Sequence, residues 1–184
     1  MLTIPVSNEI TLRTYVPADA DALFTAVNSN RQHLHPWLNW VAHTTKPEHS
    51  LKFIHDAKHR SDMQEALDMG IFLDDKVVGG IGMLNWDHDL KKAEIGYWLA
   101  REYEGKGIVI NSLNHFVPFL FNKLGLNKIE VRFVAPNKRS AKVAERLGCR
   151  IEGVLRQGML RNGMPEDLVI AGLLKSEWKP VSIS

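Results

Sequence analysis

The segment from Glu104 to Gly107, Glu-Gly-Lys-Gly, has the residue types and the spacing to bind an anion. An apolar run typical of a strand precedes it, and apolar positions at helical spacing begin at its end. Glycine lets the backbone turn sharply and approach a ligand, and free N–H groups at a helix start attract negative charge. A pyrophosphate therefore fits this point better than a neutral ligand, although a plain tight turn could have the same composition.

The spacing of these glycines excludes the common nucleotide-binding loops. A Walker loop requires glycine five residues before its Gly-Lys pair and Ser or Thr after it, but Ala100 and Gly107 occupy those positions. A dinucleotide fingerprint requires a third glycine where Ile110 stands. Any phosphate group that binds here is therefore bound by a loop of neither of these two types.

Strand and helix patterns alternate around this loop. The expected strands are 9–14, 66–73, 77–86, 93–100, 129–135 and two strands flanking the Asn162-Gly163 turn, which is the strongest hairpin signal in the chain. The expected helices begin near Ala20, at a capping box over 45–48, at Gly107 and at Ser140. Pro118 lies inside the third helix and predicts a kink or an early break. This mixed order predicts an α+β or mixed α/β fold.

Composition limits the remaining possibilities. With 184 residues, 45% of them hydrophobic, and no repeat or linker, the chain is expected to form a single domain over 1–184. The net charge of +2 is too small to favour nucleic-acid binding. One cysteine, Cys149, permits no internal disulfide, and no signal peptide or membrane-length apolar run is evident. A cytoplasmic protein without a membrane partner is expected.

Four motifs together resemble the GNAT N-acetyltransferases. They are Glu94-Ile-Gly-Tyr-Trp-Leu99, the Gly105-Lys-Gly107 loop, Asn137-Lys-Arg-Ser140 and the Leu147-Gly148 helix end. Within that family the chain resembles the RimJ/RimL branch, the ribosomal-protein N-terminal acetyltransferases, from about Leu12 to Trp178. The resemblance implies a bent, mostly antiparallel mixed sheet of about seven strands. About four helices flank this sheet, and its fourth and fifth strands splay apart.

The resemblance also implies acetyl-CoA as co-substrate and assigns residues to it. Its pantetheine arm would lie in the splay and its pyrophosphate on the glycine loop. The cofactor-binding residues implied are Tyr97, Trp98, Leu99, Gly105, Lys106, Gly107, Ile108, Val109, Asn137 and Ser140, mostly through their backbones. Asn and Ser are also favoured helix caps, so Asn137 and Ser140 have an equally good structural explanation. The basic residues Lys138, Arg139 and Lys142 could meet a phosphate or simply face solvent.

The chain departs from the GNAT pattern at three positions. Glu104 stands where Gln or Arg usually precedes the first glycine, and Val109 replaces a small residue. An acidic Glu104 should repel a pyrophosphate slightly unless its side chain points away. Ala144 replaces the tyrosine with which many of these enzymes protonate the thiolate, so Ser140 becomes the substitute candidate.

Acetyl transfer to an amine requires a base, because an ammonium group has no free lone pair. Glu94 is the first candidate, and a surface carboxylate balancing Lys91 and Lys92 is the alternative. Asn137 and Ser140 complete the expected catalytic set. His55 and His59 have i, i+4 spacing but no third ligand, so no metal site is expected.

The acceptor is expected to be a primary amine, most readily the N-terminal α-amino group of a ribosomal or other protein. Trp37, Trp40 and Trp86 could line its cleft or pack in the core, and the 159–166 hairpin could close one side. A polyamine or an aminoglycoside is the alternative acceptor. A non-catalytic acyl-CoA-binding module is a further alternative, but it would need neither Asn137 nor Ser140. The branch resemblance allows a homodimer.

Overall fold

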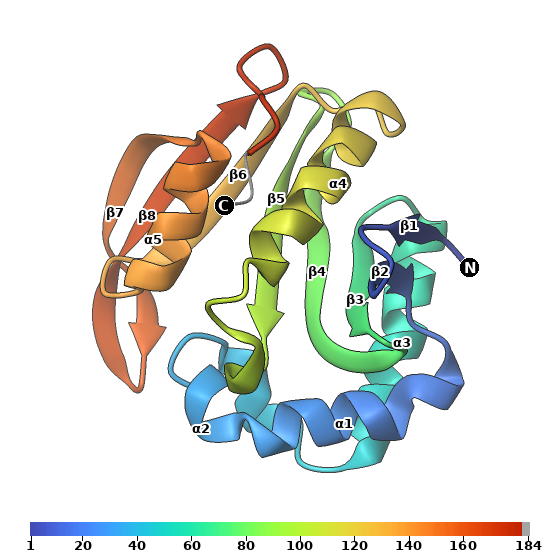
Figure 1. Cartoon of the computed structure of the whole chain (residues 1–184). Coiled ribbons are helices and arrows are strands. Elements are labelled where there is room, and N and C mark those ends of the chain that lie inside the picture. The colour runs from blue at the N-terminus through green and yellow to red at the C-terminus, as the bar shows by residue number, and fades with distance from the viewer. Residues whose placement is uncertain (182–184) are drawn as a thin grey trace.

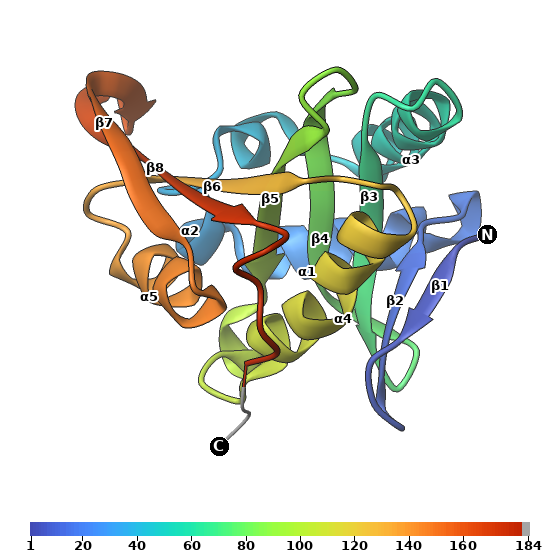
Figure 2. The ribbon, with the colours of Figure 1, turned by 90° about the horizontal axis from the view of Figure 1, so that it is seen from above.

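The computed structural model describes residues 1–181, which contain eight strands. These are β1 (Thr3–Pro5), β2 (Ile10–Thr14), β3 (Leu67–Leu73), β4 (Lys76–Asp87), β5 (Lys92–Leu99), β6 (Lys128–Val134), β7 (Arg150–Arg161) and β8 (Met164–Leu174). They form one sheet in the order β1-β2-β3-β4-β5-β6-β8-β7, with β5 and β6 parallel and every other neighbouring pair antiparallel (Figure 1). Seen from above, the sheet bends strongly between β1 at one edge and the curled β7–β8 hairpin at the other (Figure 2).

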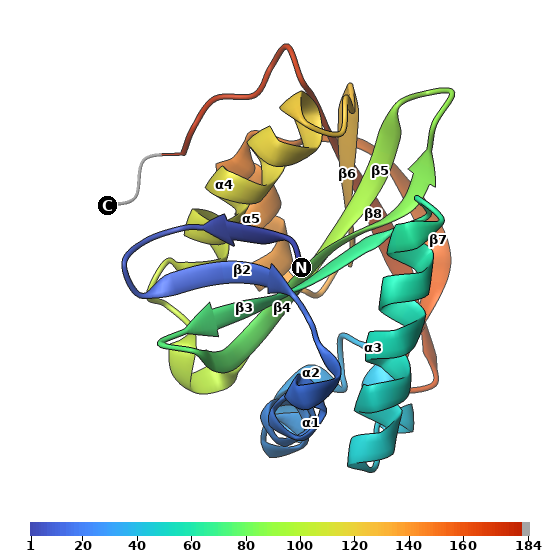
Figure 3. The same ribbon diagram turned by 90° about the vertical axis from the view of Figure 1, so that its right-hand side faces the viewer.

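Five α-helices and three short 3₁₀ segments accompany the sheet in this part of the chain. They are η1 (Pro17–Asp19), α1 (Ala20–Ser29), α2 (Arg31–Leu34), η2 (Asn39–His43), α3 (Pro47–Asp62), η3 (Arg101–Tyr103), α4 (Ile108–Asn122) and α5 (Lys138–Leu147). The helices α4 and α5 lie on one face of the sheet, and α1, α2 and α3 lie on the other (Figure 3).

Each face of the sheet has its own apolar core. The larger one packs α4 and α5 against the strands and includes the fully buried Phe116 and Leu147. The smaller one packs α1 and α3 around Leu23, Ile54 and Phe72. Burying a large apolar side chain contributes about 2 kcal/mol, so both layers hold the central strands β4 and β5 rigidly in place.

The sheet splits between β5 and β6. Their parallel pairing runs only from Lys92 opposite Lys128 to Ile95 opposite Val131. Beyond that point β5 stays paired with β4 as far as Leu99, and β6 stays paired with β8 as far as Val134. The two strands diverge into a V (Figure 1), so their facing edges lack a strand partner.

The structure confirms the predicted fold and corrects some elements. The splayed fourth and fifth strands of the sequence analysis are β5 and β6, and the crossover through α4 joins them. The turn at Asn162-Gly163 has the two positive φ values, 52° and 77°, that a tight hairpin requires. The sheet has eight strands where about seven were predicted, because β1 spans only three residues and has no readable pattern. It has five helices where about four were predicted, because α2 is a single turn.

One local prediction about the helices was wrong, and one of the two alternatives expected at Pro118 is excluded. The N-cap of α3 is Lys46 without a side-chain cap, so the expected capping box from Thr45 is not formed, and Pro47 starts the helix instead. The early break at Pro118 is absent, since α4 continues to Asn122. Burial of the apolar residues around Pro118 offsets its missing N–H donor.

Candidate active site

The glycine loop forms a cluster of backbone N–H groups at the start of α4. Gly105 and Gly107 adopt φ values of 76° and 73°, in the left-handed region that favours glycine. The first bond of the helix runs from the N–H of Asn111 to the carbonyl of Gly107 at 2.9 Å. The N–H groups of residues 108–110 precede this bond and are left without a helical acceptor. The loop therefore has the donors and the dipole that an anion requires.

A cleft of about 1900 Å³ extends from this loop through the splay. Most of the residues expected at the site line it. They are Glu94, Tyr97, Trp98, Leu99, Gly105, Gly107, Ile108, Val109, Asn137 and Ser140. Lys106 does not line it, and its ammonium lies 5.2 Å from the ring centre of Tyr103. Alternation along β5 places Glu94 and Trp98 on the sheet face opposite to Tyr97, so the cleft opens to both layers.

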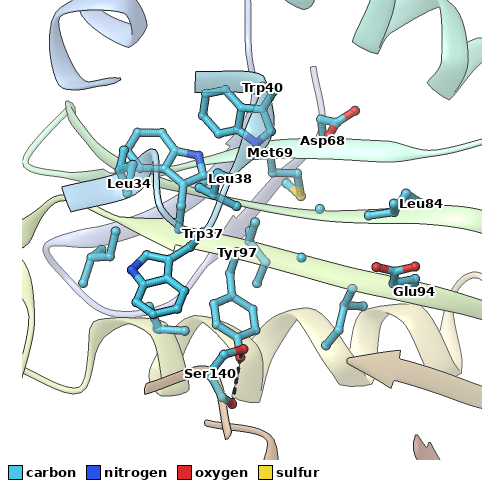
Figure 4. Close-up of a pocket in the computed structure, with 18 of the residues that line it drawn as sticks. Leu34, Trp37, Leu38, Trp40, Asp68, Met69, Leu84, Glu94, Tyr97 and Ser140 are labelled. Atoms are coloured by element: carbon cyan, nitrogen blue, oxygen red, sulfur yellow. Dashed lines mark hydrogen bonds between the residues drawn. The ribbon is translucent and has the colours of Figure 1, made fainter. Parts of the chain in front are cut away.

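Ser140 and Asn137 meet at the start of α5. The side-chain oxygen of Asn137 caps the helix by accepting from the N–H of Ser140 at 3.1 Å. The hydroxyl of Ser140 lies 3.0 Å from that of Tyr97, which reaches it from β5 (Figure 4). Burial raises the pKa of Tyr97 to about 12, so its hydroxyl is neutral. Asn137 has the structural role of a cap, and both side chains still face the cleft.

Glu94 lies on the far side of the same gap. Its carboxylate accepts from Asn85 at 3.1 Å and lies 3.5 Å from Arg132 on β6. Burial raises the pKa of Glu94, and although Arg132 and Asn85 oppose the effect, the net direction is upward. The structure does not support pairing with Lys91 or Lys92, since Lys92 instead lies 3.3 Å from Glu130. Glu94 thus has the partly buried, raised-pKa environment typical of a general base.

The side chain of Glu104 lines the cleft and contacts two basic side chains. Its two carboxylate oxygens lie 3.1 Å from His33 on α2 and 3.2 Å from Arg139 on α5. The carboxylate therefore ties the two helices together across the cleft. Of the neighbouring basic residues, Arg139 and Lys142 line the cleft, whereas Lys138 bonds the carbonyl of Ala135 at 3.3 Å.

Aromatic side chains wall the cleft on the side of α2 and η2. Trp40 packs edge-on against Trp98 with ring centres 6.3 Å apart, and Trp37 faces the same space (Figure 4). The guanidinium of Arg161, on the β7–β8 hairpin, lies 5.4 Å from the ring centre of Trp37. Met159 of the hairpin also lines the cleft. The hairpin therefore closes one side, as the sequence predicted.

Several residues around the site were missed from the sequence. The side chain of Tyr97 was overlooked because only its backbone was expected to act, and Arg132 was not considered as a partner for Glu94. Asn85 could have been found, because it follows Leu84, which pairs with Glu94 across the β4–β5 hairpin. The contacts of His33 and Arg139 with Glu104 have no sequence signal.

Among residues 1–181, no three His, Cys, Asp or Glu side chains lie close enough to hold a metal ion. In that same part of the chain, none of the helices has the length and apolar character needed to cross a bilayer.

Comparison with known proteins agrees with this geometry. A model of the GNAT acetyltransferase domain matches residues 9–150. YdaF of Bacillus subtilis, named as a candidate ribosomal N-acetyltransferase, is 34% identical over 180 residues, covering 97% of this chain and 98% of its own. The structure of RimL, a ribosomal-protein α-N-acetyltransferase in complex with coenzyme A, has a TM-score of 0.91 at 25% identity, covering 94% of this chain and 98% of RimL. The microcin self-immunity acetyltransferase MccE, in complex with acetyl-CoA and AMP, has a TM-score of 0.87 at 29% identity, covering 92% and 94%.

The chain belongs to the GNAT acetyltransferase domain family. The splayed strands and the glycine loop are features that the resemblance to this family implied. The chain is accordingly an acetyl-CoA-dependent N-acetyltransferase, and its predicted resemblance to the RimJ/RimL branch is confirmed.

Proposed function

We propose that this enzyme acetylates the N-terminal α-amino group of a protein, with ribosomal proteins as the first candidates. The observation that carries this proposal is the charge balance of the cleft. Five carboxylates line it, and four of them are paired with a basic side chain: Asp56 with Lys52, Asp68 with Arg60, Glu94 with Arg132 and Glu104 with Arg139. Paired carboxylates attract a single ammonium group but give little net field for a polycation. The ribosomal acceptor of RimL supports the same choice.

The cleft fits acetyl-CoA by its own chemistry. The unpaired edge of β5 over residues 96–99 offers backbone partners to the pantetheine amides, and the N–H groups from Gly105 to Val109 suit the pyrophosphate. Lys142 adds positive charge to the cleft wall, and Arg139 lines it while paired with Glu104. When bound, acetyl-CoA supplies an activated thioester.

The remaining steps fall to the residues of the chain. Glu94 takes a proton from the acceptor ammonium, directly or through a water molecule, so that the amine lone pair becomes free. A backbone N–H of β5 polarises the acetyl carbonyl, as an oxyanion donor does. The hydroxyl of Ser140 donates a hydrogen bond toward the sulfur, and Asn137 holds Ser140 in place through the helix cap. No covalent bond to the enzyme is needed.

We propose further that the whole chain, 1–184, acts as one domain in the cytoplasm and pairs with a second copy through β7. β7 is an edge strand of the sheet, and its Ile151, Val154 and Leu155 are about half exposed or more, at 69%, 50% and 49%. Open edges with apolar side chains favour pairing with another chain. Light scattering on gel-filtered protein tests the dimer, and a monomeric mass would contradict it.

The experiment for the acceptor is mass spectrometry after incubation with acetyl-CoA. Purified ribosomal proteins, spermine and kanamycin are offered separately, with the Glu94→Gln enzyme as control. We expect acetylation of one or a few protein N-termini. Unmodified N-termini beside acetylated spermine or kanamycin would establish the small-molecule alternative. Tight acetyl-CoA binding with no turnover on any amine would indicate a non-catalytic module.

A further inference from the structure

Tyr97 crosses the gap between β5 and α5 to reach Ser140. Its hydroxyl oxygen lies 3.0 Å from Oγ of Ser140 and 3.4 Å from the Ser140 carbonyl oxygen. The two residues are 43 positions apart in the chain, and they approach one another from opposite sides of the splay (Figure 4). This places a tyrosine hydroxyl beside Ser140, although Ala144 removes the tyrosine that the family usually carries on this helix.

Each of the two hydroxyls has one hydrogen, so either can donate in this pair, and the two directions leave the Ser140 hydrogen in different places. A tyrosine hydroxyl has one hydrogen, and the nearer acceptor is Oγ of Ser140. If Tyr97 donates to Oγ, the hydrogen of Ser140 is free to turn toward the cleft. If Ser140 donates instead, its hydrogen is engaged by Tyr97, and the hydrogen of Tyr97 turns to the Ser140 carbonyl oxygen at 3.4 Å. The neutral state of Tyr97, whose pKa is raised to about 12 by burial, keeps its hydrogen available across the working pH range.

The hydroxyl of Ser140 is not required by the helix. Capping is done by Asn137, whose side-chain oxygen accepts from the Ser140 N–H. Ser140 sits in the first turn of α5, where the helix dipole favours a developing negative charge nearby. Its hydroxyl therefore has one fixed neighbour, Tyr97, and one open side, the cleft.

We propose that Tyr97 is a positioning residue that donates to Oγ of Ser140 and so directs the Ser140 hydrogen to the coenzyme A sulfur. This inference rests on the proposed function, in which Ser140 faces that sulfur. The amine nitrogen bonds to the acetyl carbon, and the carbon–sulfur bond then breaks with its electron pair on sulfur while the nitrogen loses its remaining extra proton to solvent. Ser140 stabilises the charge on sulfur by a hydrogen bond, and Tyr97 keeps its own proton. The thiolate then takes its proton from solvent.

The test compares Tyr97→Phe with Ser140→Ala and the double variant, using Tyr15→Phe as a matched control. Tyr15 also has a buried hydroxyl that makes a hydrogen bond, to the Gly79 carbonyl at 3.3 Å, in the other core. Two readouts are needed. The first is kcat at saturating substrates, and the second is the affinity of the resting enzyme for coenzyme A relative to desulfo-coenzyme A above the thiol pKa. The second readout involves no turnover.

We expect Tyr97→Phe to lower kcat about tenfold with little change in KM, and to remove most of the preference for coenzyme A over its desulfo analogue. Ser140→Ala should do the same, Tyr15→Phe should do neither, and Tyr97→Phe should add nothing in the Ser140→Ala background. Wild-type behaviour of Tyr97→Phe beside an impaired Ser140→Ala would overturn the role of Tyr97 alone. Full additivity would also overturn it, and a silent Ser140→Ala would remove the proposed role of Ser140 itself.

Discussion

The carboxylate of Glu104 lies 3.2 Å from the guanidinium of Arg139, and this ion pair partly balances the negative charge beside the glycine loop. The two residues come from opposite sides of the cleft mouth, one before α4 and one at the start of α5. The pairing explains how an acidic residue is tolerated where the family usually has Gln or Arg. It also leaves Arg139 partly neutralised.

Glu104→Gln should therefore strengthen the binding of acetyl-CoA. A charge several ångströms from the pyrophosphate, partly screened by Arg139, is worth about a fivefold change in KM at low salt. The gain should shrink as ionic strength rises, because salt screens exposed charges. Steady-state kinetics at two salt concentrations measures this, with Glu102→Gln, an exposed residue of η3, as control. A raised KM for acetyl-CoA in Glu104→Gln would contradict this and would mean that the carboxylate stabilises the conformation of the glycine loop.

Gly107→Val should raise the KM for acetyl-CoA at least about tenfold. A β-branched residue at a φ of 73° strains the turn by about 1–2 kcal/mol and moves the N–H groups that follow it. Gly125→Val is the matched control, because Gly125 has the same φ of 73° with open space around its Cβ position and lies outside the cleft. It should lose similar stability but keep its KM. Equal KM values for both variants and wild type would refute the pyrophosphate assignment.

Glu94→Gln should lower kcat about 10²- to 10⁴-fold, since the amide cannot accept the proton. In the wild type, activity should fall as pH decreases through the pKa of Glu94. Burial raises this pKa, so the acid limb of the pH–activity profile should lie above the ordinary glutamate pKa. Arg132→Gln should move the limb to higher pH, because Arg132 lowers the pKa of Glu94. Glu152→Gln, on β7 and paired with Lys128, should leave the profile unchanged. An unaltered kcat in Glu94→Gln would exclude the base.

Trp37→Ala should raise the KM for the amine acceptor about tenfold and leave that for acetyl-CoA unchanged. The indole forms one wall of the acceptor side, and the Arg161 guanidinium lies against it. Leu160→Ala removes a 58% exposed side chain from the same hairpin and should affect neither constant. A rise confined to acetyl-CoA would place Trp37 on the cofactor side instead.

Asp19→Asn should destabilise the fold by about 2 kcal/mol at pH 7. Burial raises the pKa of Asp19, but two bonds from Arg13 at 2.7 and 2.8 Å and one from the Val16 N–H outweigh it, and the net pKa is lowered. The ionised form therefore stabilises the protein above the unfolded pKa, and this stability is lost as pH falls through the lower folded pKa. Urea unfolding at pH 7 and pH 3 should show a variant deficit that shrinks in acid. The exposed Asp56→Asn should show a much smaller deficit, because water screens its pair with Lys52.

Local patterns predicted most of the fold because each rests on neighbouring residues. The period of α4, the β3–β4 hairpin and the Asn162-Gly163 turn are all set within a few positions. The four-residue α2 and three-residue β1 are too short to show a period, and they form because neighbouring elements hold them.

The sequence predicted where the site lies more fully than it predicted which side chains contact one another there. The glycine loop and the start of α5 are contiguous motifs. The contact of Tyr97 with Ser140 depends on how far β5 and β6 splay, and the contact of Glu104 with His33 depends on where α2 packs. These distances depend on tertiary packing among many residues, and they could not be predicted from a single sequence.

The most direct test of acetyl transfer to a protein N-terminus uses one synthetic peptide with a free α-amino group and one internal lysine. The enzyme is incubated with this peptide and acetyl-CoA, and fragment masses locate any acetyl group. We predict acetylation of the α-amino group alone, at a rate that Glu94→Gln lowers at least about a hundredfold. Acetyl groups on the lysine alone, or none on this peptide while spermine is acetylated, would contradict the account.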